Sequence, residues 1–108
     1  MRKGEWTFLT NHGRLFTYIA KHPKSTAQGI AQEAGLSIRA VQKIIADLEK
    51  VSYITRHREG RCNRYTVNPE MPMRHPLERD HPVGDILLAL GYRLKKRTLT
   101  KYNDPSRA

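Results

Sequence analysis

The sequence is poor in cysteine and in long apolar stretches. Its 108 residues include one cysteine, Cys62, so the chain alone forms neither a disulfide framework nor a zinc site built on several cysteines. No apolar run approaches the roughly 18–20 residues that a membrane-spanning helix requires. The charged N-terminus is not followed by the apolar segment of a secretory signal. We therefore expect a cytoplasmic protein with no membrane partner.

Acidic residues are also scarce. Ten Asp and Glu stand against twenty Lys and Arg, which gives a formal net charge of +10. Residues 1–68 carry twelve basic and five acidic side chains, a net +7, and residues 69–108 carry eight and five, a net +3. A positive excess of this size favours a polyanionic partner, and it is concentrated in the first part of the chain.

Motifs of catalysis and metal binding are missing as well. The sequence contains no nucleophile-and-base arrangement and no glycine loop that cradles a phosphate, so we expect neither an enzyme nor a cofactor. The five histidines are scattered. His75, Glu78 and His81 form the closest grouping, but Pro76 and Pro82 interrupt any regular helix there, so no metal site is predicted. No effector ligand is identified.

Helical patterns fill the first half of the chain. Apolar spacing predicts a helix from Arg14 to His22, with Asn11 as a plausible N-cap and Pro23 as its end. A second helix, Ala27 to Ala34, follows a cap at Ser25 or Thr26. A third runs from a Ser37 cap to about Val51. The apolar stripe predicted for this third helix consists of Ile38, Val41, Ile44, Ile45 and Leu48.

The segment from Thr26 to Val51 therefore has the form of a helix-turn-helix. Ala31 is small enough for two helices to cross closely, and Gly35, four residues later, permits a left-handed turn. A helix-turn-helix places its second helix in the major groove of DNA. An ordinary helical hairpin in a small helical domain is the alternative.

Several residues near the start of the third helix are candidates for contacting DNA. An arginine can grip guanine and a glutamine can grip adenine, whereas a small apolar side chain can touch a thymine methyl group. A lysine or a helix-capping serine suits a phosphate. The candidates for base contacts are Arg39 for guanine, Gln42 for adenine and Ala40 for a thymine methyl group. The candidates for phosphate contacts are Lys43 and Ser37.

A β-hairpin is predicted after the third helix. The runs Tyr53–Arg58 and Cys62–Val67 have strand character and flank the turn Glu59-Gly60-Arg61. Arginine at a hairpin favours insertion into the minor groove, whose potential is negative. The predicted inward residues are Ile54, Tyr65 and Val67, and the outward candidates for DNA binding are Arg56, Arg58, Arg61 and Arg64.

Two stretches of the chain resemble winged helix-turn-helix transcriptional regulators. They are LTNHGRLFTYIAKHP and STAQGIAQEAGLSIRAVQKIIADLEKVSYITRHREGRCNRYTVN. In particular, they resemble the small bacterial MarR- and ArsR-like proteins. The resemblance implies a mainly α, α+β fold with a three-helix core and a hairpin wing. It also implies a third helix in the major groove, a wing on the flanking backbone or minor groove, and a homodimer.

The remainder of the chain, residues 69–108, lies outside that resemblance. Four prolines between Asn68 and Pro82 predict an extended linker. An additional C-terminal helix of about three turns is predicted next, and a basic tail begins at Arg93. We expect this helix to pair with a second copy of the chain, through the apolar residues Val83, Ile86, Leu87, Leu90 and Leu94. The alternative is that the helix folds back on the core of its own chain.

The sequence thus predicts a winged-helix domain over residues 1–68 and a dimerisation segment over residues 69–108. The predicted function is sequence-specific binding of double-stranded DNA by a homodimer that regulates transcription, as a repressor that occupies a promoter. The alternatives are a nonspecific architectural or RNA-binding winged helix and a winged helix that binds proteins.

Overall fold

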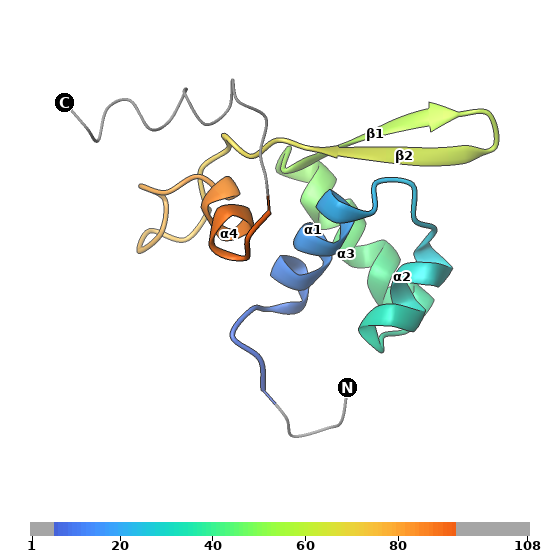
Figure 1. The fold of residues 1–108 in the computed structure, drawn as a ribbon, viewed down its shortest axis with the longest axis horizontal. Coiled ribbons are helices and arrows are strands. Elements are labelled where there is room, and N and C mark those ends of the chain that lie inside the picture. The colour runs from blue at the N-terminus through green and yellow to red at the C-terminus, as the bar shows by residue number, and fades with distance from the viewer. Residues whose placement is uncertain (1–5, 93–108) are drawn as a thin grey trace. The chain divides into compact units, whose positions relative to one another are not determined.

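The computed structural model describes residues 6–92. The chain divides into two compact units, Met1–Val67 and Asn68–Ala108. The first contains α1 (Asn11–Lys21), α2 (Ala27–Ala34), α3 (Ile38–Lys50), β1 (Ile54–Glu59) and β2 (Cys62–Val67), and the second contains α4 (Gly84–Ala89) (Figure 1). Three helices followed by a two-stranded antiparallel hairpin form a winged helix, which confirms the predicted fold class.

Hydroxyl side chains begin all three helices of the first unit. Thr26 Oγ1 accepts a hydrogen bond from the backbone N–H of Gly29 at 3.0 Å, and Ser37 Oγ accepts one from Ala40 at 3.0 Å. The cap at Ser37 is as predicted, and of the two candidates for α2, Ser25 and Thr26, the structure selects Thr26. For α1, however, the cap is Thr10, which accepts from Gly13 at 3.2 Å. The helix therefore begins at Asn11, three residues before the predicted start.

The turn between α2 and α3 has the predicted left-handed backbone. Gly35 follows α2 with φ 71° and ψ 34°, and its N–H donates to the carbonyl of Ala31. A side chain at this position would strain the backbone, because L-residues other than glycine disfavour this conformation. The glycine consequently sets the angle at which α3 leaves α2.

Apolar side chains from all five elements of the first unit form its core. Tyr65 is the buried aromatic residue of the wing. Ile54, the first residue of β1, is also buried and lies opposite Val67 in the hairpin. Val67 is only half-buried. The buried apolar residues of the unit are Leu15, Phe16, Ile19, Ala20, Ile30, Ala31, Val41, Ile44, Ile45, Leu48, Ile54 and Tyr65.

The prediction that Ile38 belongs to this core is wrong. Its side chain is 45% exposed, whereas Val41, one turn further along, is fully buried. At 100° per residue, Ile38 lies only about 20° round the helix axis from the buried Ile45, so its angle alone does not expose it. It is the first residue of α3, and its position at the end of the helix leaves it at the margin of the buried stripe.

The hairpin is regular and is anchored at its base. Its register runs from Ile54 opposite Val67 to Glu59 opposite Cys62, which leaves Gly60 and Arg61 as a two-residue turn. The N–H of Tyr65 donates to the carbonyl of Pro23 at 2.8 Å. This bond ties β2 to the connection between α1 and α2, and the hairpin extends beyond the helices from there (Figure 1).

The second unit differs from the expected extended linker. Pro72 and Pro82 form an antiparallel bridge, and the N–H of Met73 donates to the carbonyl of His81 at 3.0 Å. The chain therefore folds back on itself between these prolines. Proline has no N–H donor, so the bridge is held by the N–H groups of the neighbouring residues Met73 and Val83, and Val83 donates to the carbonyl of Met71 at 2.8 Å.

The helix of the second unit is shorter than the predicted three turns. Helix α4 spans six residues, none of the described side chains caps its start, and Gly91 adopts φ 82° just after its end. Leu94 and the basic tail from Arg93 lie outside the described residues. Within residues 6–92, no helix combines the length and the apolar composition needed to cross a membrane.

Candidate nucleic-acid interface

The outer face of α3 presents polar and basic side chains. Arg39, Gln42 and Lys43 are exposed there, opposite the buried stripe of the helix. Within residues 6–92, the side chains of Arg39 and Gln42 make no hydrogen bond or ion pair with other parts of the protein. Their donors and acceptors are therefore available to a ligand.

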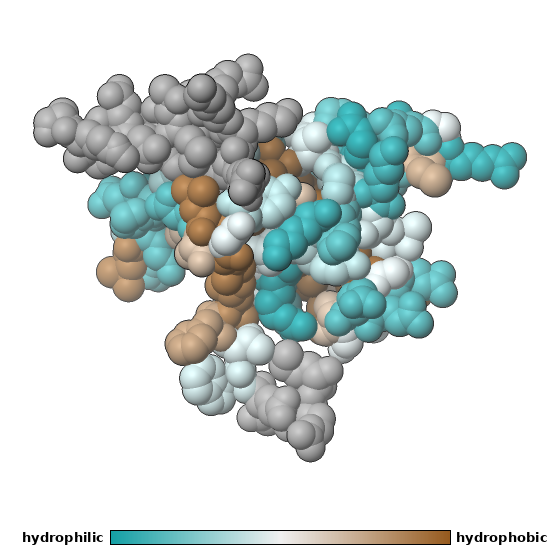
Figure 2. Space-filling view, viewed as in Figure 1, coloured by the Kyte–Doolittle hydropathy of each residue, from teal (hydrophilic) through white to brown (hydrophobic). Residues whose placement is uncertain are grey.

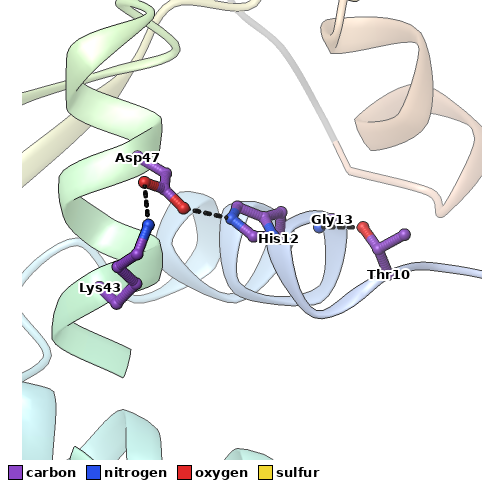
Figure 3. A network of polar contacts seen from close by, with 5 residues as sticks. All are labelled: Thr10, His12, Gly13, Lys43 and Asp47. Carbon is purple, nitrogen blue, oxygen red and sulfur yellow. Dashed lines mark hydrogen bonds and ion pairs between the residues drawn. The ribbon is translucent and has the colours of Figure 1, made fainter. Parts of the chain in front are cut away.

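Lys43 differs from these two because it already has a partner. Its Nζ lies 3.0 Å from Asp47 Oδ1, and the other oxygen of Asp47 lies 2.8 Å from His12 Nε2 of α1 (Figure 3). The hydrogen bond from His12, and then that from Lys43, lowers the pKa of Asp47. The network links α1 to α3. The Lys43 side chain is nonetheless 74% exposed, so it can exchange the carboxylate for a phosphate at little cost.

The candidates at the start of α3 differ in accessibility. Ser37 is exposed, but its hydroxyl oxygen is occupied as the helix cap. Ala40 is half-buried. It lies about 160° round the helix axis from Gln42, so the two side chains do not share a face.

Three of the four wing arginines are bound within the protein. Arg56 grips Glu49 of α3 with two nitrogens, at 2.5 and 3.0 Å, and this hydrogen bonding raises its pKa. Arg64 Nε donates to Glu59 at 2.7 Å, which lowers the pKa of Glu59. Arg58 Nε donates to the carbonyl of Gly60 at 2.9 Å.

Arg61 occupies the hairpin turn. Within the described chain its side chain has no hydrogen bond or ion pair, in contrast to the other three wing arginines. Hydrophilic side chains cover the hairpin on the face shown in Figure 2. Arg61 is therefore the wing cation that is most readily available to an outside anion.

A cleft of about 420 Å³ joins α3 to the wing. Besides Gln42 and Ile45 of α3, its walls come from the start of α2 and from the hairpin. Three cationic side chains, Lys24, Arg56 and Arg61, line it, and Glu49 compensates only Arg56. The other lining residues are Ser25, Thr26, Ala27, Cys62, Asn63 and Tyr65.

Sequence reasoning missed Lys24 and Asn63 as members of this site. Lys24 is brought to the wing by the bond between Tyr65 and Pro23, a contact across 42 positions (65 minus 23) that no local pattern reveals. Asn63 Oδ1 is buried and lacks a hydrogen-bond partner among the described residues. A buried acceptor of this kind is normally satisfied, so a donor from a bound ligand or a water suits it.

Among residues 6–92, no group of three or more His, Cys, Asp or Glu side chains is placed to hold a metal ion. His81 Nδ1 lies 3.2 Å from Asp85 in the second unit, and His75 Nδ1 accepts from the backbone of Leu77 at 3.0 Å. Each of these histidines thus has a local partner within the protein.

The residues predicted to form a dimer interface do not share one exposed face. Val83 is 5% exposed and Leu87 is fully buried, so neither offers surface to a second chain in this conformation. Ile86 is half-buried and Leu90 is 52% exposed. Of the predicted set, Ile86 and Leu90 are the described members that retain accessible apolar surface.

The fold of the first unit is a winged helix. No protein-family model matches the sequence, and no curated protein matches it. A variant of Lactococcus lactis ZitR shares 19% identity at a TM-score of 0.55, over 99% of this chain and 67% of that one. A variant of MepR from a multidrug-resistant S. aureus clinical isolate shares 15% at 0.53, over 88% and 64%. The chain thus spans about two thirds of the length of these proteins, and at these identities the similarity shows the fold.

Proposed function

We propose that this protein is a transcriptional regulator that binds double-stranded DNA in a sequence-specific manner. The observation that carries the proposal is the pair Arg39 and Gln42 on the outer face of α3, both exposed and without partners in the described part of the chain. Both types of side chain form two-pronged contacts with bases in the major groove. The proteins of known structure that share the fold are winged-helix transcriptional regulators, and this supports the same role here.

In this proposal α3 enters the major groove, where Arg39 contacts guanine and Gln42 contacts adenine. Lys43 exchanges Asp47 for a phosphate. The cleft between α2, α3 and the wing receives the sugar–phosphate backbone, where Lys24 and Arg61 supply the positive charge. Arg61 continues to the flanking minor groove, which favours arginine. Arg56, Arg58 and Arg64 chiefly hold the wing in shape.

We further propose that the protein acts as a homodimer and represses transcription by occupying a promoter. Two helices α3 related by a two-fold axis fit two half-sites about one turn of DNA apart. Exposed apolar surface suited to pairing includes Leu90 and the aromatic pair Trp6 and Phe8, whose ring centroids are 5.3 Å apart. We expect sedimentation at micromolar concentration to show a dimer, and a monomer would contradict this part of the proposal.

Selection of bound sequences from a pool of random duplexes tests the DNA-binding function. We expect the full chain to recover a palindromic motif. Gln42→Ala should relax preference at one position of each half-site, whereas Gln32→Ala, an equal change on the exposed face of α2, should leave the motif intact. Failure to recover any motif, with equal binding to all duplexes, would favour a nonspecific winged helix instead.

A salt titration separates the phosphate contacts from the base contacts. We expect Arg61→Ala to weaken binding to all sequences by a similar factor. The slope of log K against log salt should fall by about 0.9, because one phosphate contact is lost. An unchanged slope would show that Arg61 does not meet the backbone. Absence of duplex binding at moderate salt would favour a protein-binding role.

A further inference from the structure

Ile38 stands out among the large apolar residues of α3 because it is the first residue of the helix and is 45% exposed. The others, Val41, Ile44, Ile45 and Leu48, are at most 6% exposed. A single exposed isoleucine on a protein surface is unexceptional. Its position matters here, because the first turns of a recognition helix are the part that reaches the base edges.

The helix geometry places Ile38 beside the polar reading face. At 100° per residue, its Cα–Cβ direction lies about 40° from that of Gln42 and 100° from that of Arg39. Ser37, immediately before it, caps the helix and orients the first turn. Ile38 therefore projects from the same end of α3 as the side chains that we propose to read bases, and it lies closest in direction to Gln42.

The charge around Ile38 indicates what covers it. Arg39 is the next residue of the helix and is exposed, and the first 68 residues carry a net +7. A second copy of the same surface would be repelled, whereas a polyanion is attracted. Within the major groove, the apolar group on the edge of a base pair is the C5-methyl of thymine.

We propose that Ile38 contacts a thymine methyl group and makes the protein select a T·A pair at one position in each half-site. This inference rests on the DNA-binding function proposed above. It assigns to Ile38 the role that the sequence suggested for Ala40, which is half-buried and lies on a different side of the helix.

Replacing thymine by uracil in the selected duplex tests the contact, because uracil removes only the methyl group. Each thymine is replaced in turn, and the Kd is measured for the wild type and for Ile38→Ala, Ile38→Val and Leu77→Ala. Leu77 is 87% exposed in the second unit and is the matched control. Thermal melting confirms that each variant is folded.

We expect the wild type and Leu77→Ala to lose about fourfold in affinity at one position of each half-site when the methyl is removed, as for one buried methylene-sized group. Ile38→Ala should bind the thymine and uracil duplexes equally, and Ile38→Val should retain part of the discrimination. Alanine is compatible with a helix, and valine is branched like isoleucine. We therefore expect at least one of the two variants to fold.

Three outcomes would overturn the inference. If no uracil substitution weakens the wild type, Ile38 contacts no methyl, although the protein still binds specific DNA. If Ile38→Ala discriminates as well as the wild type does, another residue makes the contact. If the selection recovers no motif, both the inference and the proposed function are wrong.

Discussion

The ion pair between Glu49 and Arg56 gives opposite predictions for stability and for DNA binding. It joins the last turns of α3 to β1 through two hydrogen bonds at 2.5 and 3.0 Å. Glu49→Gln keeps the size of the side chain, removes its charge and releases Arg56 into the cleft that faces the proposed DNA backbone. We expect this variant to be less stable and to bind DNA more tightly.

The magnitudes follow from exposure and charge. The two side chains are 26% and 46% exposed, so solvent screens the pair, and its two-pronged geometry places it near the upper end of surface ion pairs. The expected loss in the free energy of unfolding is about 0.5–1 kcal/mol. If Arg56 then meets a phosphate, the slope of log K against log salt steepens by about 0.9, so that raising salt from 50 to 200 mM costs about a further threefold in affinity.

Urea unfolding and fluorescence anisotropy across a salt series measure the two effects. Glu33→Gln is the matched control, because it makes the same charge change at an exposed position of α2 and breaks no ion pair among the described residues. The double variant Glu49→Gln/Arg56→Gln closes a thermodynamic cycle. The reasoning is refuted if Glu49→Gln matches the control in both assays, or if it weakens DNA binding while the fold is intact.

Two further predictions concern stability. The pKa of Asp47 is lowered in the folded protein, so its contribution is present above 3.8 and is lost as the pH falls through the folded-state pKa. Urea unfolding should therefore show Asp47→Asn less stable than the wild type near pH 6, with the difference shrinking at more acidic pH; a constant difference would contradict this assignment. Gly60→Ala should lower the free energy of unfolding by about 1 kcal/mol, because Gly60 has φ +63° although no atom would obstruct a Cβ, and an unchanged urea midpoint would show that the turn relaxes without cost.

Features governed by neighbouring residues were predictable from the sequence. Thr26 and Ser37 cap their helices through hydrogen bonds that span three positions, and Gly35 ends α2 with its own backbone. Local chemistry of this kind fixes α2 and α3 closely. At α1 the rule was ambiguous, because Thr10 and Asn11 are adjacent and both residue types cap helices well.

Features that depend on distant residues were not predictable. The bonds between His12 and Asp47, and between Arg56 and Glu49, span 35 and 7 positions. From the number of basic residues alone, every arginine of the wing would be available to bind DNA. In the folded protein, Arg56 and Arg64 form ion pairs with carboxylates. Lys24 joins the cleft because of a strand that begins 38 positions later (62 minus 24).

Periodicity alone also overestimated two apolar stripes. Ile38 continues the spacing of Val41 and Leu48, but the helix presents it beyond the edge of the packed surface. In the second unit the apolar spacing continues past Leu90, yet α4 ends there, where Gly91 takes a left-handed conformation. A repeating pattern predicts which side of a helix is apolar. The length of the helix and its contacts decide which of the apolar residues on that side are buried.

Because β2 is anchored through Tyr65, the base and the turn of the wing differ in how well they tolerate substitution. At the base, Tyr65 is part of the core of the unit, and its N–H donates to the carbonyl of Pro23. The turn at Gly60 and Arg61 lies several residues beyond that anchor, and both residues are exposed. The length and the charge of the turn can therefore be changed, in evolution or by design, to alter what the wing contacts. The three helices keep their arrangement when this is done.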